Sequence, residues 1–191
     1  TSEEYVEDEK YWEELINKTS HRPYIPILMR PEKVVNTGAK QIIRKFKDEQ
    51  YEILTTIAKK NQITPFSLLL TVFSKVLSLY SKNQAFFLNV PMSIRTSEVM
   101  NLNNTVGQFS NFSFIPVDDS ANLSIADMSH NIQETLLDCR EHSSFLGTDV
   151  LKLFQKRIGA SIPAPITFTS TIGSNKESLI LLNNFEIVGY D

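Results

Sequence analysis

Residues 64–80 have the sequence TPFSLLLTVFSKVLSLY, and residues 85–90, after a short polar break, have the sequence AFFLNV. Thr64 is a residue type that caps helices, and Pro65 suits the first helical turn, where a missing N–H has no consequence. Large apolar residues then recur at spacings of three and four, which predicts a deeply buried helix. The residues expected to face the core are Phe66, Leu69, Leu70, Phe73, Val76, Leu77 and Tyr80. The β-branched and aromatic run that follows predicts a buried strand.

Two further helices are predicted upstream. The first covers residues 1–17, with Thr1 and Glu4 at capping-box spacing. Its first fourteen residues hold seven carboxylates, which we interpret as a solvated face. Three prolines and a glycine in residues 20–40 then predict an extended connector. The second helix covers residues 48–60, and its apolar face is expected to consist of Tyr51, Leu54, Ile57 and Ala58.

Downstream of residue 90 the chain alternates between further strands and helices. The predicted elements are a polar loop at 95–105, strands at 111–117, 165–171 and 185–190, a helix capped by Ser124, and a helix at about 147–156. This order lacks strict βαβ alternation, so it predicts helices layered on a sheet. The expected fold class is therefore α/β, in the form of an α+β layered sandwich.

Composition narrows the class of protein. The chain has 191 residues, 41% of them hydrophobic, which excludes a wholly disordered chain. Its formal charge of −3 gives no basic footprint for nucleic acid. No apolar run approaches the roughly 18 residues of a membrane helix, and the acidic start does not resemble a signal peptide. We expect a cytoplasmic segment of a longer polypeptide.

General motifs of catalysis and metal binding are missing from the sequence. It contains no phosphate loop, no glycine-rich dinucleotide turn and no histidine pair at metal-binding spacing. His21, His130 and His142 are interpreted as surface or packing residues, and Cys139 as a small buried residue of a helix. Spacing alone therefore predicts an α/β domain and no particular chemistry.

Six short strings, however, occur along the chain in a recognisable order. They are Tyr11-Trp12 with RPYIPIL at 22–28, TPFSLLL at 64–70, LNVP at 88–91 with Arg95, VGQFS at 106–110, the segment from His142 to Leu151, and PITFTSTIG at 165–173. Together they resemble the C-terminal half of a nonribosomal peptide synthetase condensation domain, in particular the heterocyclisation subtype. The resemblance implies a chloramphenicol-acetyltransferase-like lobe, with a mixed sheet covered by helices. Residues 1–40 would form an acidic helix and connector, and residues 41–191 the lobe, incomplete at both ends.

The resemblance also implies partners and an activity. This lobe would meet the N-terminal lobe of the same domain across a tunnel, and upstream and downstream carrier proteins would deliver substrates on phosphopantetheine arms. The intact domain would form an amide and cyclise Cys, Ser or Thr to a thiazoline or oxazoline, as in siderophore or antibiotic biosynthesis. The lobe itself would bind no cofactor and no metal, would contact neither nucleic acid nor membrane, and would be inactive alone.

Individual residues are assigned by the same resemblance. The catalytic residue would be Thr169, acting with an aspartate beyond residue 191. Tunnel positions are Gly107, Gln108, Ser110 and Ser170, and structural motif positions are Asn89, Arg95, His142 and Gly147. Gln108, Ser110 and Leu146 depart from the family's Asp, Thr and Ser, and Gln108 removes a carboxylate near the tunnel. Two alternatives stay open: a plain amide-forming condensation domain, and a catalytically silent lobe that docks carrier proteins.

Overall fold

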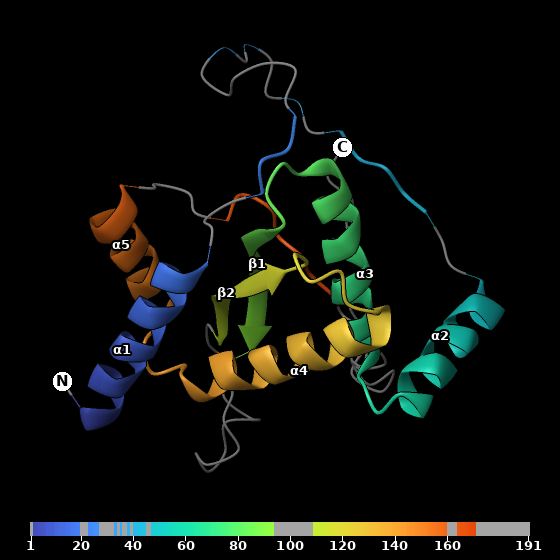
Figure 1. The fold of residues 1–191 in the computed structure, drawn as a ribbon, viewed down its shortest axis with the longest axis horizontal. Coiled ribbons are helices and arrows are strands. Elements are labelled where there is room, and N and C mark those ends of the chain that lie inside the picture. Colours follow the sequence, from blue (N-terminus) through green and yellow to red (C-terminus); the bar gives the residue numbers. More distant parts are fainter. Residues whose placement is uncertain are drawn as a thin grey trace, which may run out of the picture.

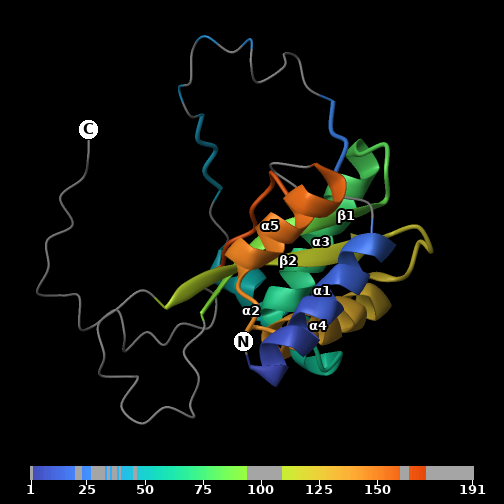
Figure 2. The same ribbon diagram turned by 90° about the vertical axis from the view of Figure 1, so that its left-hand side faces the viewer.

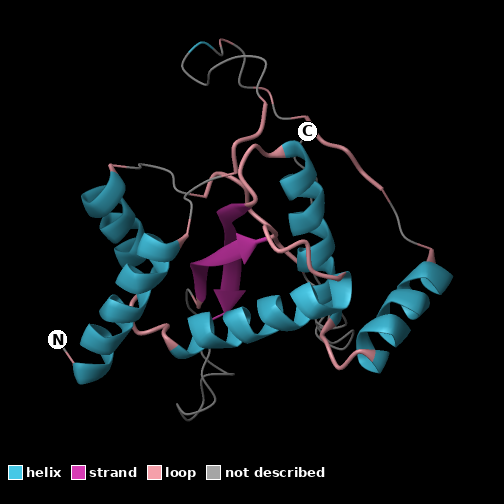
Figure 3. Ribbon diagram, in the orientation of Figure 1, coloured by secondary structure: helices cyan, strands magenta, loops and turns pink. Residues whose placement is uncertain are grey.

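The structure is a computed structural model that describes residues 2–19, 23–26, 33, 35, 38, 40–44, 47–93, 109–159 and 164–170. Figure 3 distinguishes its helices from its strands. The described elements are, in order, α1 (Glu3–Lys18), α2 (Asp48–Lys60), α3 (Pro65–Tyr80), β1 (Ala85–Ser93), β2 (Ser110–Asp118), α4 (Ile125–Glu141) and α5 (Gly147–Ile158). The predicted loop at 95–105 and the predicted strand at 185–190 lie outside the described residues.

The strands β1 and β2 form the middle layer of the structure. They pair antiparallel, with Ala85 opposite Asp118 and Ser93 opposite Ser110. Figures 1 and 2 show α1 and α5 on one side of this ribbon and α3 and α4 on the other, with α2 set apart beyond α3. Ring contacts from Phe154 of α5 to Phe87 and Phe114 fix the α5 side of the sheet.

A third extended segment, residues 164–170, lies beside β1. The Asn89 N–H donates to the Ile166 carbonyl at 3.0 Å, and the Phe168 N–H donates to the Asn89 carbonyl at 2.9 Å. The resulting parallel bridge between Asn89 and Thr167 makes the sheet mixed, as predicted. Backbone groups alternate between the two edges of a strand, so the nitrogen of Pro91, like that of Asn89, lies at the edge of β1 that faces residues 164–170. Pro91 has no N–H. It therefore cannot donate the next hydrogen bond of this pairing.

One apolar core joins the three layers. Its side chains come from all of the described helices except α2, from both strands and from the third extended segment. The largest of them with less than 2% of their surface exposed are Phe86, Phe87, Phe154, Ile16, Leu70, Leu88 and Ile115. Trp12 of α1, at 2% exposed, belongs to the same core. A small second cluster of Ala58, Ile63 and Leu68 connects α2 to α3.

The helix α3 begins as predicted but buries a different face. Thr64 accepts a hydrogen bond from the Ser67 N–H, and Pro65 occupies the first turn. Its buried face consists of Ser67, Leu68, Leu70, Thr71, Ser74 and Ser78. Two of these small hydroxyls are satisfied locally, since Thr71 donates to the Ser67 carbonyl and Ser74 to the Leu70 carbonyl.

The prediction of a deeply buried α3 is therefore wrong for its large outer residues. Val76 is 46% exposed and Tyr80 is 67% exposed. Small residues allow α3 to approach α4 closely, and the bulky side chains are left at the flanks and outside. The same error affects α2, where Tyr51 and Ile57 are exposed and only Ala58 is fully buried.

Helix starts elsewhere are close to their predicted positions. Ser2, and not Thr1, caps α1, because its hydroxyl accepts from the Tyr5 N–H. Ser124 caps α4 as predicted, by accepting from the Asp127 N–H at 3.1 Å. No single helix in the described part of the chain is long and apolar enough to cross a membrane, although α2 and α3 together reach that length and hydropathy with a 100° bend between them.

The buried face of α3 leads to a stability prediction. Leu70→Ala removes a side chain with no exposed surface, so it should lower the free energy of unfolding by about 2–5 kcal/mol. Val76→Ala on the outer face of the same helix should change it by only about 0.5 kcal/mol. Urea unfolding followed by circular dichroism measures both. Equal losses from the two variants would mean that the inward face is assigned wrongly.

Candidate functional site

The candidate site is a polar face of the mixed sheet. Asn89 of β1 donates its side-chain amide N–H to the Thr167 hydroxyl oxygen at 3.3 Å. Side chains alternate along an extended segment, so Thr169 projects on the same side as Thr167. Both threonines are exposed, whereas the Oδ1 atom of Asn89 is buried and accepts no hydrogen bond from the described residues. We call Asn89, Thr167 and Thr169 the polar strand face.

Phe168 sets which way this polar strand face points. Its ring lies 5.5 Å from that of Phe66 and 5.3 Å from that of Phe73, measured between centroids, and both partners belong to α3. Because Phe168 faces α3, the two threonines beside it must face the α5 side of the sheet. Sequence alternation and the aromatic contacts together orient the threonines.

The predicted tunnel residues fall into two groups. Ser110 begins β2, opposite Ser93, and Ser170 ends the described part of the third segment. Gly107 and Gln108 lie outside the described residues, as do Arg95 of the structural motif and Thr171. Among the predicted structural motif positions that the structure describes, Asn89 is the one that contacts segment 164–170, through Thr167.

Gly147 is required for a close packing contact at the start of α5. A Cβ atom at this position would lie 2.0 Å from the Phe112 carbonyl oxygen, which only glycine avoids. The preceding Leu146 gives α5 no side-chain cap. Asn111 of β2 supplies an acceptor instead, since its Oδ1 atom accepts from the Gly147 N–H at 3.2 Å. Leu146 therefore stands where the family has a serine, and the Gly147 N–H still has a hydrogen-bond acceptor.

His142 connects α4 to α1. Its ring stacks on Tyr11 with centroids 3.8 Å apart and planes 7° apart, and its Nδ1 atom lies 2.8 Å from the Asp138 carbonyl oxygen. The indole N–H of Trp12 donates to the His142 carbonyl at 3.1 Å. These contacts are with α1 and α4, and none of them involves the polar strand face.

One carboxylate of α1 is not part of a solvated face. Asp8 is buried and accepts hydrogen bonds from both the N–H and the hydroxyl of Ser144. The interpretation of all seven carboxylates as surface residues is therefore wrong for Asp8. Nothing local marks it, because Ser144 is 136 residues away in the sequence.

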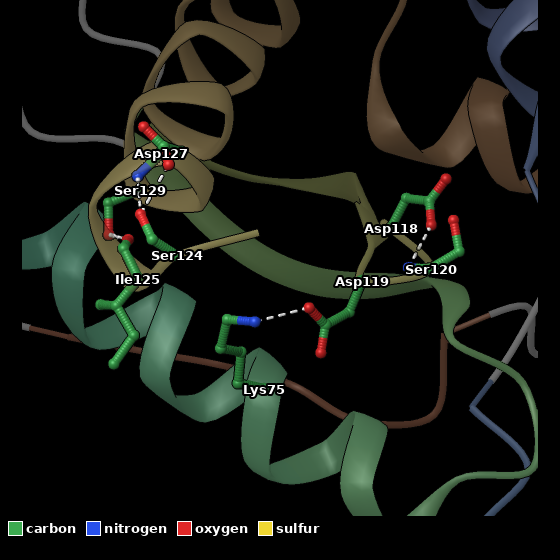
Figure 4. A network of polar contacts seen from close by, with 8 residues as sticks. All are labelled: Lys75, Asp118, Asp119, Ser120, Ser124, Ile125, Asp127 and Ser129. Carbon is green, nitrogen blue, oxygen red and sulfur yellow. Dashed lines mark hydrogen bonds and ion pairs between the residues drawn. The ribbon is translucent and has the colours of Figure 1, made fainter. Parts of the chain in front are cut away.

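Charged and polar contacts also hold the loop between β2 and α4, as Figure 4 shows. Lys75 of α3 forms an ion pair with Asp119 at 2.6 Å, and both side chains are largely buried. Asp118 accepts from the Ser120 N–H at 2.9 Å. This network ties α3 to the end of β2 and lies apart from the polar strand face. Within the described ranges, no group of three or more His, Cys, Asp or Glu side chains could hold a metal ion.

Comparison with known proteins identifies the family. A family model described as "Condensation domain" matches residues 1–155. The chain belongs to the condensation-domain family of nonribosomal peptide synthetases. The match ends before residue 164, so the position of Thr169 comes from the structure and from the resemblance of its string.

Similar proteins support this membership at the level of sequence and fold. The chain is 25% identical to bacitracin synthase 1 of Bacillus licheniformis over 91% of its own length and 3% of that protein. It is 30% identical to phenyloxazoline synthase MbtB of Mycobacterium tuberculosis over 61% of its length and 8% of that protein. The cyclization-docking bidomain of EpoB from Sorangium cellulosum has a similar fold, with a TM-score of 0.79 at 20% identity over 91% of this chain and 35% of that one. The expected condensation-domain fold, of the α/β class, is confirmed.

Within this condensation-domain segment, Asp8 gives a second stability prediction. Asp8→Ala leaves the Ser144 N–H and hydroxyl without their buried acceptor, which should cost about 1–3 kcal/mol of unfolding free energy. Glu7→Ala, at an exposed position one residue earlier, should have little effect. Urea midpoints of the two variants provide the test, and a Glu7 effect as large as that of Asp8 would contradict it.

Cys139 gives a prediction about pH. Burial raises the pKa of its thiol from the ordinary 9.0 to about 11, and burial also raises the pKa of the Tyr11 hydroxyl that lies 3.7 Å from its sulfur. As the pH rises, the thiol of the unfolded chain therefore loses its proton before the thiol of the folded protein does. The contribution of the neutral Cys139 to the free energy of unfolding is thus complete below pH 9 and is lost as the pH rises through 11. Unfolding free energies measured between pH 8 and 11 should fall, and should fall less in Cys139→Ala. The same decline in both proteins would refute this cause.

Proposed function

We propose that this chain is the part of a heterocyclising condensation domain that carries the polar strand face. Two comparisons support the proposal: one relative is named as an oxazoline synthase, and one similar structure is a cyclization bidomain. The observation that carries it is the hydrogen bond between the Asn89 amide and Thr167, beside an exposed Thr169. Three neighbouring polar groups on one strand face offer donors and acceptors to a reacting amide.

The reaction has two stages with different needs. In the first, the amine of the downstream aminoacyl group attacks the upstream thioester, an amide forms, and the carrier thiol leaves. In the second, the side-chain thiol or hydroxyl of the new residue attacks the amide carbonyl, and the resulting hemiaminal loses one water to give a thiazoline or oxazoline. The second stage moves protons onto a poor leaving group and therefore needs a placed acid and base.

Thr169 is proposed to serve this second stage. Thr169 is an exposed residue, and its hydroxyl would hydrogen-bond the hemiaminal oxygen, while Thr167 is held by Asn89 on the same face. A threonine hydroxyl is too weak a base to act by itself. The proposal therefore includes a carboxylate partner, expected in the polypeptide beyond residue 191.

The proposed partners follow from family membership. The N-terminal lobe of the domain would complete a tunnel, and two carrier proteins would present phosphopantetheine-linked substrates at its mouths. The chain spans less than a tenth of each of the two curated relatives described above, so the partners of the whole protein are part of this proposal. Plain amide formation and silent docking are the competing functions, and the products of the reaction distinguish all three.

The central prediction concerns Thr169→Ala in the intact domain with both loaded carriers. Loss of the hydroxyl should reduce ring formation by about 10²-fold, within the range that a positioned acid–base group contributes. Amide formation should fall much less, since it uses an amine that is already nucleophilic and depends mainly on positioning. Uncyclised amide should therefore accumulate, and Thr169→Ser should retain part of the cyclisation. Mass spectrometry of the intact carrier separates the products by one water.

Two controls accompany this measurement. Thr167→Val keeps the side-chain shape and removes the hydroxyl that Asn89 holds, so it should affect both products to a similar and smaller extent. Residues 1–191 alone should form neither product. Equal loss of ring and amide from Thr169→Ala would indicate a packing role, an intact domain that makes amide only would indicate plain condensation, and a domain that makes neither would indicate a docking lobe.

A further inference from the structure

One row of side chains crosses the sheet from the third extended segment to β2. Pro91 of β1 lies opposite Phe112 of β2 in the antiparallel pair. At its other edge, β1 bridges to the third segment in parallel, at Asn89 and Thr167. Both chains run in the same direction there, so two residues further on Thr169 lies beside Pro91. We call Thr169, Pro91 and Phe112 the cross-sheet row.

The cross-sheet row lies on the α5 side of the sheet. Alternation puts Phe112 and Phe114 on one face of β2, and their ring centroids lie 5.6 Å apart. Phe114 in turn contacts Phe154 of α5, which identifies this face. Residues directly opposite each other in an antiparallel pair share a face, so Pro91 is on the same side as Phe112. Thr169, as part of the polar strand face, is on this side too.

The two ends of the cross-sheet row differ in chemistry. Thr169 is exposed and offers a hydroxyl, and Pro91, also exposed, gives an apolar surface in the middle. Phe112 at the far end is partly buried and packs against the apolar core. The start of α5 holds its ring, because a Cβ atom at Gly147 would lie 2.8 Å from the ring atom Cδ2. The row therefore runs from a hydrogen-bonding group to a fixed apolar ring.

The length of the row limits what can lie along it. Neighbouring strands are about 4.8 Å apart, so the backbones of Thr169 and Phe112 are roughly 10 Å apart across Pro91. In the proposed reaction, the amide that reacts at Thr169 joins two groups. One is the Cys, Ser or Thr residue, whose short side chain closes the ring, and the other is the upstream acyl group. Of these two, only the upstream acyl group can bring a long apolar side chain to Phe112.

We propose that Phe112 is a specificity-determining residue, which selects an upstream acyl group with an aromatic or large aliphatic side chain that lies over Pro91. The inference rests on the proposed function and adds the class of its upstream substrate. Such a side chain buries apolar surface on Phe112 and Pro91, and buried apolar area favours binding. An alanyl group is too short to reach the ring, and a charged side chain would lose hydration against it.

Competition between two upstream acyl groups in the intact domain tests this selection. The upstream carrier is supplied as an equimolar mixture of phenylalanyl and alanyl forms, with a cysteinyl carrier downstream, and mass spectrometry measures the products from each. The parent should use the phenylalanyl group at least about tenfold more efficiently, since differences in apolar side-chain size are worth about 10–200-fold in a fitted site. Phe112→Ala should remove most of this preference, and Phe112→Leu, which keeps an apolar side chain, should remove less.

Leu136→Ala is the matched control. Leu136 of α4 is a partly buried side chain packed against the same apolar core, but it is not in the cross-sheet row. Its truncation should leave the preference unchanged even where it lowers the yield, because both acyl groups compete for the same folded protein. A loss of preference in Leu136→Ala as large as that in Phe112→Ala would overturn the proposal.

The same spectra separate this inference from the proposed function. The ratio of phenylalanyl to alanyl products, summed over ring and amide, tests the role of Phe112, whereas the ratio of ring to amide tests cyclisation. A domain that makes amide alone but keeps the Phe112-dependent preference would support the inference and contradict cyclisation. Equal use of the two acyl groups by the parent, or an unchanged preference in Phe112→Ala, would overturn the inference. A domain that forms no product from either acyl group would overturn both.

Discussion

The two backbone hydrogen bonds of Asn89 are the constraint on which the candidate site depends. They hold segment 164–170 parallel to β1 and fix its register at Thr167. With that register set, Phe168 must face α3 and the threonines must face the opposite side of the sheet. The side chain of Asn89 adds a hydrogen bond to Thr167, so one residue positions both the backbone and a hydroxyl of the polar strand face.

The layers around the sheet make this constraint possible. Phe87 and Phe114 contact Phe154 of α5 on one face. On the other side, the small buried residues of α3 allow this helix to pack closely on α4, which contacts β2. Gly147 lets α5 begin directly against the backbone of β2. Proline at position 91 has no N–H and therefore cannot donate the next hydrogen bond to the third segment. The site is thus a short pairing within a well-packed sandwich, and its threonines are left accessible.

The sequence predicted the features that are local. The Thr64 cap with Pro65, the two strands and the starts of α4 and α5 depend on neighbouring residues, and each is found close to its predicted position. The predicted buried face of α3 is wrong because the periodicity argument considers only large apolar residues. In the structure, Ser67, Thr71 and Ser74 pack inward, and the hydroxyls of Thr71 and Ser74 donate to carbonyls of their own helix.

The parts that could not be predicted join residues far apart in the sequence. Asp8 and Ser144 meet only after α1 has docked, and Asn89 reaches Thr167 across 78 residues. No local pattern distinguishes Asp8 from the six other carboxylates around it. The string PITFTSTIG indicated a strand and a family, and alternation puts Thr167 and Thr169 on one face, but the register is what shows that Asn89 shares this face. The catalytic role of Thr169 stays a prediction.

Because every part of the site depends on the pairing at Asn89, the most direct measurement is the through-hydrogen-bond NMR coupling between the Phe168 amide nitrogen and the Asn89 carbonyl carbon. A detectable coupling, together with slow exchange of the Phe168 amide, is the predicted result. An amide that exchanges as in an unstructured peptide, or a coupling to a carbonyl other than that of Asn89, would contradict the register and with it the polar strand face.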